Sequence, residues 1–441
     1  MADPMRDLSA RSAGTPSLLR DSAFRWLWTG QVASLLGDNL YAMVVVALTV
    51  PTSERPALTL GVAMAARFLA LALFIVLGGV LADRLPRFRL LAFADVVRPL
   101  ALIPLALLGG DSPFWLIAAV SFVMGAGEAL YGPTYDASIP SIARPDMLAR
   151  ANSASKVVRS LARVVGPGAA AVFVSTLGAK GAIATAMVAF VASLATLGVL
   201  RARGHSGGAP APRQEGATVL REALDGFSVL VRMRWLAALE VMAATHVLLA
   251  VAPWLVLLPI ITERGTGGIN TYAWLLGAFS AGGIPGALVA SRLRLRRPGV
   301  ALLLGLMPFG IACLALGGKA SMVLLVPLFF IAGFGTEVTD VLKMTAIQQQ
   351  VAPEFLGRVF SLDFLASFVT MPLGQLLTGV FVAPGQERSM MQWAGIVILS
   401  TTLLPLLVPG VASLGSAKSS TAPGGLAEGV LPQMNSGEAS S

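Results

Sequence analysis

Acidic and basic residues interrupt the apolar segments of the first half of the chain, which are long enough to cross a membrane. They are Asp38, Arg67, Asp95, Arg98, Glu128, Lys156, Arg159 and Arg163. Charged groups in such segments are costly and usually face a polar cavity, where they pair, bind a charged substrate or carry protons. Asp38 and Glu128 are therefore candidates for a carboxylate that takes up a proton in one state and releases it in another.

Spacing along the helices separates pairing from proton coupling. Asp95 and Arg98 are three residues apart, which puts both on one helical face and predicts a structural ion pair. No base lies within one helical turn of Asp38, so we expect a functional role for this carboxylate. For Glu128 both interpretations stay open.

Bases outnumber carboxylates in these segments of the first half. Lys156, Arg159 and Arg163 follow at spacings of three and four, which places them on one stripe of a helix. Together with Arg67 they either form permanent intramembrane ion pairs or leave a positive surplus. A surplus would favour an anionic substrate such as a siderophore.

The second half has fewer ionisable residues. His246 lies 208 positions after Asp38, and its imidazole titrates in the range that a proton relay needs, although a neutral core histidine is the commoner case. Glu337, Asp340 and Lys343 lie three apart near the inner end of an apolar segment. They form either a cytoplasmic gate or a solvated helix end.

The sequence lacks the motifs of ATP-binding proteins, zinc proteases and serine hydrolases. The chain has no GxxxxGK[ST], HExxH or GxSxG pattern, and Cys313 is its single cysteine. We therefore expect no enzyme, cofactor or metal site. The net charge of +9 comes largely from arginines beside apolar segments, where they orient helices, so nucleic acid is not the expected partner.

Apolar segments of membrane-spanning length must hold the charged residues. The chain is 56% hydrophobic and 12% charged with a mean hydropathy of +0.77, whereas soluble domains carry roughly 25% charged residues. We expect an all-α integral membrane protein with twelve transmembrane helices. The expected spans are 26–50, 57–82, 89–109, 113–134, 151–176, 178–200, 236–260, 271–291, 299–317, 321–345, 357–383 and 390–413.

One offset of 208 residues relates separate segments. Residues 78–89 read GGVLADRLPRFR and 286–297 read GALVASRLRLRR, while 122–127 read FVMGAG and 330–335 read FIAGFG. Internal repeats of this kind are typical of transporters whose two halves rock around a site between them. We therefore expect two six-helix bundles in a 6+6 parallel repeat.

The distribution of Lys and Arg predicts the topology. The odd-numbered connections hold only Arg55, Lys180, Arg264, Lys319 and Arg388, so both termini are expected in the cytoplasm. The predicted parts are a cytoplasmic segment at 1–20, bundles at 21–200 and 235–414, a cytoplasmic linker at 201–234 and a disordered tail at 415–441.

Some aromatic and polar side chains have packing interpretations. Trp254, Tyr272, Trp274 and Trp393 lie near span ends and fit an aromatic belt at the membrane surface. Gln375 could line a cavity, but packing is the simpler expectation.

The connection after the second expected span carries a gating motif. Its sequence GGVLADRLPRFR resembles the G-x-L-A-D-R-x-G-R-K signature of the major facilitator superfamily, and Pro86 departs from the usual glycine. The matching residues are Gly79, Leu81, Ala82, Asp83, Arg84 and Arg87. The resemblance covers residues 20–414 and implies that Gly79, Asp83, Arg84 and Arg87 gate the cytoplasmic side, with Asp83 latching onto a helix start near Gly357.

Four further stretches, at 24–40, 95–98, 148–168 and 357–375, resemble the branch that contains the enterobactin exporter and macrolide-efflux proteins. Gly166, Pro167 and Gly168 resemble part of an antiporter signature. The resemblance implies proton-coupled efflux of a bulky amphipathic drug, macrolide or siderophore-like molecule across the inner (plasma) membrane. The expected partners are the substrate, protons and the bilayer, and the chain is expected to act as a monomer. Alternatives are an uptake permease or lipid flippase on the same fold, or a transport-inactive receptor or scaffold.

Overall fold

The computed structural model describes residues 21–144, 147–205, 233–265, 267–290, 292–293, 295–351, 359 and 369–414, without the side chains of 75–84, 149, 163 and 164. Within these residues the chain forms helices and no strand. The helices of the first half are α2 (Ser22–Thr49), α3 (Pro56–Arg84), α4 (Arg87–Leu108), η2 (Gly109–Asp111), α5 (Phe114–Ile142) and α6 (Leu148–Ala202). Those of the second half are α8 (Arg234–His246), η4 (Val247–Val251), α9 (Ala252–Gly265), α10 (Gly268–Ala290), α11 (Pro298–Gly317), α12 (Met322–Gln350), a helix at Val369–Phe381, α14 (Glu387–Thr401) and η5 (Leu404–Leu407).

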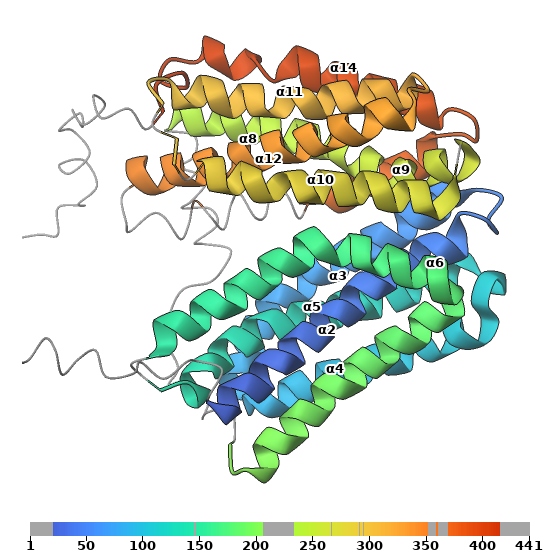
Figure 1. The fold of residues 1–441 in the computed structure, drawn as a ribbon, viewed down its shortest axis with the longest axis vertical. Helices are drawn as coiled ribbons and strands as arrows, with labels where there is room; N and C mark the ends of the chain where they lie inside the picture. The colour runs from blue at the N-terminus through green and yellow to red at the C-terminus, as the bar shows by residue number, and fades with distance from the viewer. Residues whose placement is uncertain are drawn as a thin grey trace, which may run out of the picture.

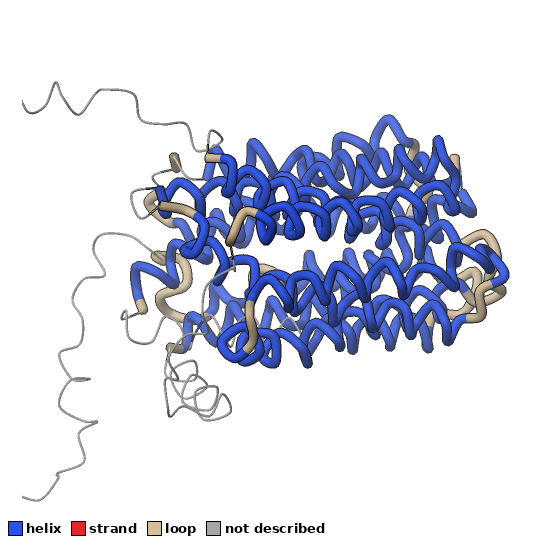
Figure 2. The backbone as a smooth tube through the Cα atoms, turned by 90° about the horizontal axis from the view of Figure 1, so that it is seen from below, coloured by secondary structure: helices blue, strands red, loops and turns tan. Residues whose placement is uncertain are grey.

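Ten helical segments of the described chain are long and apolar enough to cross a membrane. Figure 2 shows the helices running side by side, with the loops gathered at the two ends of the molecule. Helix α2 begins where the Asp21 carboxylate accepts the backbone N–H groups of Ala23 at 2.9 Å and Phe24 at 3.3 Å. The ten apolar helical segments make the chain a multi-pass membrane protein.

The predicted spans differ from these ten segments in two places. Helix α6 contains the expected spans 151–176 and 178–200, which meet at Gly178 with φ 70° and ψ 173°. Glycine adopts this backbone conformation without a Cβ clash, and the chain changes direction there (Figure 1). The expected span 357–383 is described only from residue 369 onward, as the shorter helix Val369–Phe381.

The repeat seen in the sequence has counterparts in the helix bounds. Helix α5 starts at Phe114 and α12 at Met322, and they end at Ile142 and Gln350, a shift of 208 residues at both ends. Corresponding glycines bring the partner helices together. A Cβ on Gly125 of α5 would lie 2.2 Å from the Arg67 carbonyl oxygen on α3, and one on Gly333 of α12 would lie 1.7 Å from the Phe279 carbonyl oxygen on α10. Both halves therefore use a glycine at the same position for a close helix contact.

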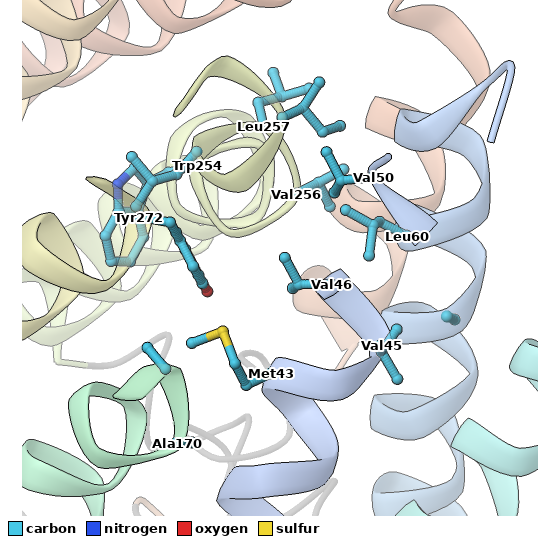
Figure 3. Close-up of a cluster of buried hydrophobic side chains, with 14 of the residues drawn as sticks. Met43, Val45, Val46, Val50, Leu60, Ala170, Trp254, Val256, Leu257 and Tyr272 are labelled. Carbon is cyan, nitrogen blue, oxygen red and sulfur yellow. The ribbon is translucent and has the colours of Figure 1, made fainter. Parts of the chain in front are cut away.

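The helices of the two halves form two groups that lie one above the other in Figure 1. The groups come together at the end of the molecule where α2 ends and α10 begins. There Met43 and Val46 of α2 pack in one buried cluster with Trp254 of α9 and Tyr272 of α10, as Figure 3 shows. This cross-half cluster closes the molecule at the end that carries the predicted outer connections.

Two aromatic residues of this cluster correct the sequence prediction. Trp254 is 5% exposed and contacts the rings of Phe279, Phe309 and Phe329, and Tyr272 is 7% exposed. Both belong to the protein core, so the prediction of an aromatic belt is wrong for them. The 69% exposure of Trp274 fits the prediction.

Candidate functional site

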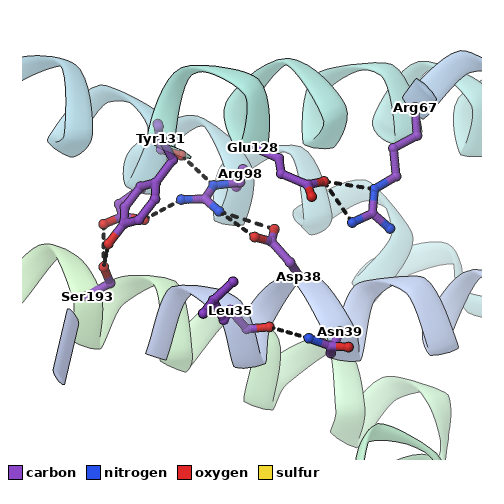
Figure 4. A network of polar contacts seen from close by, with 10 residues as sticks. Leu35, Asp38, Asn39, Arg67, Arg98, Glu128, Tyr131 and Ser193 are labelled. Atoms are coloured by element: carbon purple, nitrogen blue, oxygen red, sulfur yellow. Dashed lines mark hydrogen bonds and ion pairs between the residues drawn. The ribbon is translucent and has the colours of Figure 1, made fainter. Parts of the chain in front are cut away.

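A buried ion network joins α2 and α4 in the middle of the first half. The Arg98 Nη1 atom donates to both carboxylate oxygens of Asp38, at 3.1 and 3.0 Å, and Nη2 donates to Asp95 Oδ1 at 2.5 Å. Figure 4 shows the Arg98 guanidinium and its contacts with the Asp38 carboxylate. Arg98 and Asp95 are fully buried, whereas 11% of the Asp38 side chain is exposed. Asp38 therefore lies at the accessible edge of the network.

The expected pair of Asp95 and Arg98 is thus present, and Arg98 also contacts Asp38, which has no base within one turn of its own helix. Asp38 and Arg98 are 60 residues apart in sequence, so spacing within one helix could not reveal the contact. Asp38 shares its base with Asp95 and differs from it in being partly exposed.

Aromatic and small residues shape the site around Arg98. The guanidinium carbon lies 4.4 Å from the ring centre of Phe190 and 5.0 Å from that of Tyr131. A Cβ on Gly127 would lie 2.7 Å from the Arg98 Cγ, and one on Gly37 would lie 2.7 Å from the Phe190 ring. These two glycines make room for the buried base and its aromatic neighbour.

Ser193 of α6 connects Asp95 to Tyr131 of α5 through its hydroxyl. Its hydroxyl donates to Asp95 Oδ2 at 2.6 Å and lies 3.3 Å from the Tyr131 hydroxyl. The network therefore spans α2, α4, α5 and α6. Sequence reasoning missed Ser193, Phe190, Tyr131, Gly37 and Gly127, because single polar, aromatic or small residues in apolar helices carry no signal of their own.

A second ion pair lies beside Asp38. Arg67 of α3 donates from Nε and Nη2 to Glu128 Oε2 of α5, at 3.2 and 2.8 Å. The Glu128 side chain is 37% exposed and that of Arg67 20%. Figure 4 shows this pair beside Asp38, next to the contact of Asp38 with Arg98. Glu128 is therefore the most accessible carboxylate of the cluster.

The Arg98 network and the pair of Arg67 and Glu128 together hold five charged groups. Asp38, Asp95 and Glu128 supply three carboxylates, and Arg67 and Arg98 supply two guanidiniums. With every group ionised, the cluster carries one net negative charge, and Asp38, Asp95 and Arg98 carry theirs at largely buried positions, where an unbalanced charge is unfavourable. One bound proton neutralises the cluster, so the arrangement can hold or release a single proton.

The bases of the first limb of α6 lie apart from this cluster. Arg159 donates to Asp136 of α5 at 2.7 Å near the end of the bundle, and Lys156 is exposed. The side chain of Arg163 lies outside the described residues. The predicted basic stripe therefore does not contact Asp38 through Lys156 or Arg159.

The gating motif is described only in part. The side chains of Asp83 and Arg84 lie outside the described part of the structure. The segment around Gly357, which was expected to face Asp83, also lies outside it. Arg87 donates from Nη1 to the Ala137 carbonyl of α5 at 2.8 Å. This contact ties the start of α4 to α5, one position from Asp136.

His246 marks a break in the first helix of the second half. Its Nε2 lies 2.8 Å from the Thr401 hydroxyl of α14, and the π-helical turn η4 follows it. Pro253 lacks the N–H that would continue the regular hydrogen bonds of this helix, which accounts for a local change of winding. With the offset of 208, His246 corresponds to Asp38 and Thr401 to Ser193. The second half thus has a hydrogen-bonded pair of His246 and Thr401 where the first half has its ion network.

The three residues of the predicted cytoplasmic gate lie on α12. Lys343 pairs with Glu240 of α8 at 2.9 Å, and both side chains are largely buried. Asp340 is exposed and Glu337 half-buried on the same helix. Lys343 therefore ties α12 to α8 within one half, and the predicted gate of Glu337, Asp340 and Lys343 stays a prediction.

In the segment Gly166, Pro167 and Gly168 of α6, the two glycines lie close to two different helices. A Cβ on Gly166 would lie 2.4 Å from the Asn39 side-chain oxygen on α2, next to Asp38. A Cβ on Gly168 would lie 3.9 Å from the Gly277 Cα on α10 of the other half. This segment therefore links the neighbourhood of Asp38 to the seam between the halves.

No cluster of three or more His, Cys, Asp or Glu side chains suited to a metal ion occurs among the described residues. Cys313 is buried and unpaired.

Comparison with solved structures shows the fold. A bacterial homologue of the human lysosomal transporter Spinster, inward-facing and unoccupied, has a TM-score of 0.65 at 15% identity over 90% of this chain and 96% of that chain. A bacterial homologue of the iron transporter ferroportin, in an inward-facing state, has a TM-score of 0.69 at 14% identity over 89% and 99%. An autoinhibited peptide transporter of the POT family has a TM-score of 0.65 at 12% identity over 87% and 96%.

Similar sequences include efflux proteins. Macrolide efflux protein A of Streptococcus pyogenes is 24% identical over 365 residues, covering 81% of this chain and 89% of that protein. Multidrug efflux pump Tap of Mycobacterium tuberculosis is 24% identical over 407 residues, covering 90% and 96%. These relatives are transporters, which confirms that the chain is not of an enzyme family. The model of the transmembrane secretion effector family matches residues 13–426, and the chain belongs to this family of major facilitator efflux transporters.

Proposed function

We propose that this chain is a secondary transporter that exports a bulky amphipathic small molecule in exchange for protons by alternating access. The efflux proteins among its relatives, which act on macrolides or several drugs by name, support export of this substrate class. The observation that carries the proton coupling is the unbalanced ion cluster, in which three carboxylates share two guanidiniums.

Asp38 is the proton carrier in this proposal. It shares Arg98 with the fully buried Asp95, and Glu128 and Arg67 lie close enough to act on its charge. A proton that binds the Asp38 carboxylate ends its ion pair, while Arg98 keeps Asp95 as its partner. Glu128, with its greater exposure, is the group through which protons reach Asp38.

Protonation of Asp38 removes the ion pair that attracts α2 to α4. The residue next to Asp38 is also connected to the seam between the two halves. Asn39 contacts Gly166, and Gly168 lies against Gly277 of α10. We infer that the seam opens at the end of the cross-half cluster when the transporter turns outward. The substrate then binds between the two halves and is exposed to each side in turn.

The proposed location, topology, domain bounds and oligomeric state are those expected from the sequence. The chain lies in the inner (plasma) membrane with both termini cytoplasmic, as two six-helix bundles at 21–200 and 235–414 with a cytoplasmic linker at 201–234, and acts as a monomer. The cross-half cluster would then close the outer side.

The anionic substrate suggested by the excess of bases loses support. Arg67, Arg98 and Arg159 each pair with a carboxylate of the protein. A siderophore-like anion is therefore a less favoured cargo than a neutral or cationic amphiphile.

Transport into inverted membrane vesicles tests the proposal. Vesicles with wild-type protein and an imposed pH gradient should accumulate a macrolide or a cationic dye, and a protonophore should abolish the accumulation. Asp38→Asn should lose gradient-driven accumulation, whereas Asp136→Asn, a carboxylate paired with Arg159 outside the cluster, should keep it. Accumulation that is equal in Asp38→Asn and unaffected by the protonophore would contradict proton antiport.

A further inference from the structure

A groove lies at the seam between the two halves. It has a volume of about 790 Å³ and is lined by one helix of the first half, α6, and two of the second half, α10 and α12. Gly168, Val172 and Ser175 form the α6 wall. The opposite wall is formed by Asn270, Ala273, Trp274, Gly277, Ala278 and Ala281 of α10 with Val326, Pro327, Phe330 and Ile331 of α12.

The chemistry of the lining excludes most soluble ligands. None of these side chains is charged, and Ser175 and Asn270 are the two that are strongly polar. Large apolar side chains of the lining are open, with Val172 at 59%, Ile331 at 48% and Trp274 at 69% exposure. In a membrane-spanning region these surfaces meet lipid rather than water, so the natural occupant is an apolar chain.

The polar residues of the groove gather at one end. Ser175 lies just before the reversal at Gly178, and Asn270 lies in the first turn of α10, next to the loop that precedes Gly268. Trp274 follows one turn deeper, a position typical of an aromatic side chain at the membrane interface. The groove therefore has a polar end at the membrane surface and an apolar remainder below it, as an amphiphile has.

The length of the groove matches one leaflet. From Asn270 to Ala281 the α10 wall covers roughly 16 Å at 1.5 Å per residue. That is about half of a hydrocarbon core of roughly 30 Å. A chain that enters from one membrane surface along this wall therefore reaches the middle of the bilayer.

The two walls belong to different halves. On the second-half side the helices are fixed to each other, since Gly282 of α10 and Gly333 of α12 sit in close backbone contact with Phe330 and Phe279. On the other side α6 meets α10 at Gly168 and Gly277, without a covalent or ionic tie at that point. A ligand in the groove touches both halves, and it loses one wall if they separate at this end.

We propose that the groove between α6 and α10–α12 is a binding site for one acyl chain of a membrane phospholipid, with the polar part of the lipid at Ser175 and Asn270. The bound chain stabilises the conformation in which α6 and α10 are in contact, because the site exists only in that conformation. This site is separate from the ion cluster and does not depend on the transported substrate.

Photo-cross-linking tests the site. The full chain is reconstituted in phosphatidylcholine nanodiscs doped with a phosphatidylcholine that carries a diazirine on its acyl chain, and labelled peptides are mapped by mass spectrometry. Labels should concentrate on 168–175, 270–281 and 326–331. Val172→Trp and Ile331→Trp fill the groove from opposite walls at exposed positions, and each should reduce this labelling at least threefold.

Val188→Trp is the matched control, because Val188 is 67% exposed on the second limb of α6 and does not line the groove. It should leave the labelling unchanged. Labelling that follows exposure alone, with Val188 and Trp393 marked as strongly as the groove, would overturn the proposal. So would protein–protein cross-links at these segments in place of lipid adducts, which would mean that a second copy of the chain covers the groove. The wild-type map alone decides the question if a variant fails to fold.

Discussion

The guanidinium of Arg98 on α4 lies 3.0 Å from the carboxylate of Asp38 on α2, while its other terminal nitrogen lies 2.5 Å from Asp95. One base therefore serves two carboxylates of unequal exposure. The more accessible carboxylate can gain a proton without leaving Arg98 unpaired, which separates the structural role of Asp95 from the coupling role of Asp38.

The two carboxylates should give different phenotypes when neutralised. We expect Asp38→Asn to fold and to retain substrate exchange between equal concentrations, but to lose at least tenfold of the transport driven by a pH gradient. Asp95→Asn should lower thermal stability, because Asp95 accepts hydrogen bonds from Arg98 and Ser193 at a fully buried position. Exchange and gradient-driven transport in proteoliposomes, with a thermal-shift measurement, check both results. Equal stability loss in the two variants would contradict this division of roles.

Removal of the shared base should be the most damaging change in the cluster. Arg98→Met leaves Asp38 and Asp95 as buried carboxylates without their base, and breaking a buried pair typically costs about 3–5 kcal/mol. Arg98→Lys should restore little, because a single ammonium cannot reproduce the two-sided contact of a guanidinium. Thermal unfolding in detergent measures the loss. The triple variant Arg98→Met, Asp38→Asn, Asp95→Asn should recover part of the lost stability, because neither carboxylate is then left buried without its base.

A single methyl group added next to Arg98 should lower the stability of the protein. In Gly127→Ala the new Cβ would lie 2.7 Å from the Arg98 Cγ, and overpacking of this kind costs roughly 1–3 kcal/mol. Gly132→Ala on the same helix is the control, because a Cβ there meets no atom within 4 Å. We expect a lower midpoint of thermal unfolding for Gly127→Ala and no loss for Gly132→Ala. Similar midpoints would mean that α5 moves away at little cost.

The seam between the halves can be locked chemically. A Cβ on Gly168 would lie 3.9 Å from the Gly277 Cα, so the backbones of α6 and α10 approach closely enough here for a cysteine pair to be used as a cross-linking test. Gly168→Cys with Gly277→Cys should cross-link under mild oxidant and stop transport, and reduction should restore it. The native Cys313 is buried and should not interfere. Full transport by the oxidised, cross-linked protein would show that the seam does not open during the cycle.

Gln375 should destabilise the observed conformation. Its side chain is fully buried on the helix Val369–Phe381, and neither amide atom has a hydrogen-bond partner. Gln375→Leu should raise stability by roughly 1–3 kcal/mol, because the cost of an unsatisfied buried amide disappears. Transport should slow if this helix separates from α3 when the outer side opens. Gln348→Leu, at an exposed position on α12, is the control and should change neither quantity.

The sequence determined the features that depend on local chemistry. Apolar length and charge predicted the membrane-spanning helices, and the offset of 208 residues anticipated the matching bounds of α5 and α12. The spacing of Asp95 and Arg98 predicted their pair, because a helix places residues three apart on one face. The motif after the second span also pointed to the superfamily, to which the matching family belongs.

The tertiary structure decided which residues from different helices meet. The contact of Asp38 with Arg98 spans 60 residues, Trp254 is buried although it stands near the end of an apolar segment, and the groove takes its walls from α6, α10 and α12. Helix periodicity specifies which face a side chain occupies but not which neighbouring helix covers that face. That choice depends on the packing of all helices together, in which glycines such as Gly127 and Gly168 set how closely two backbones approach.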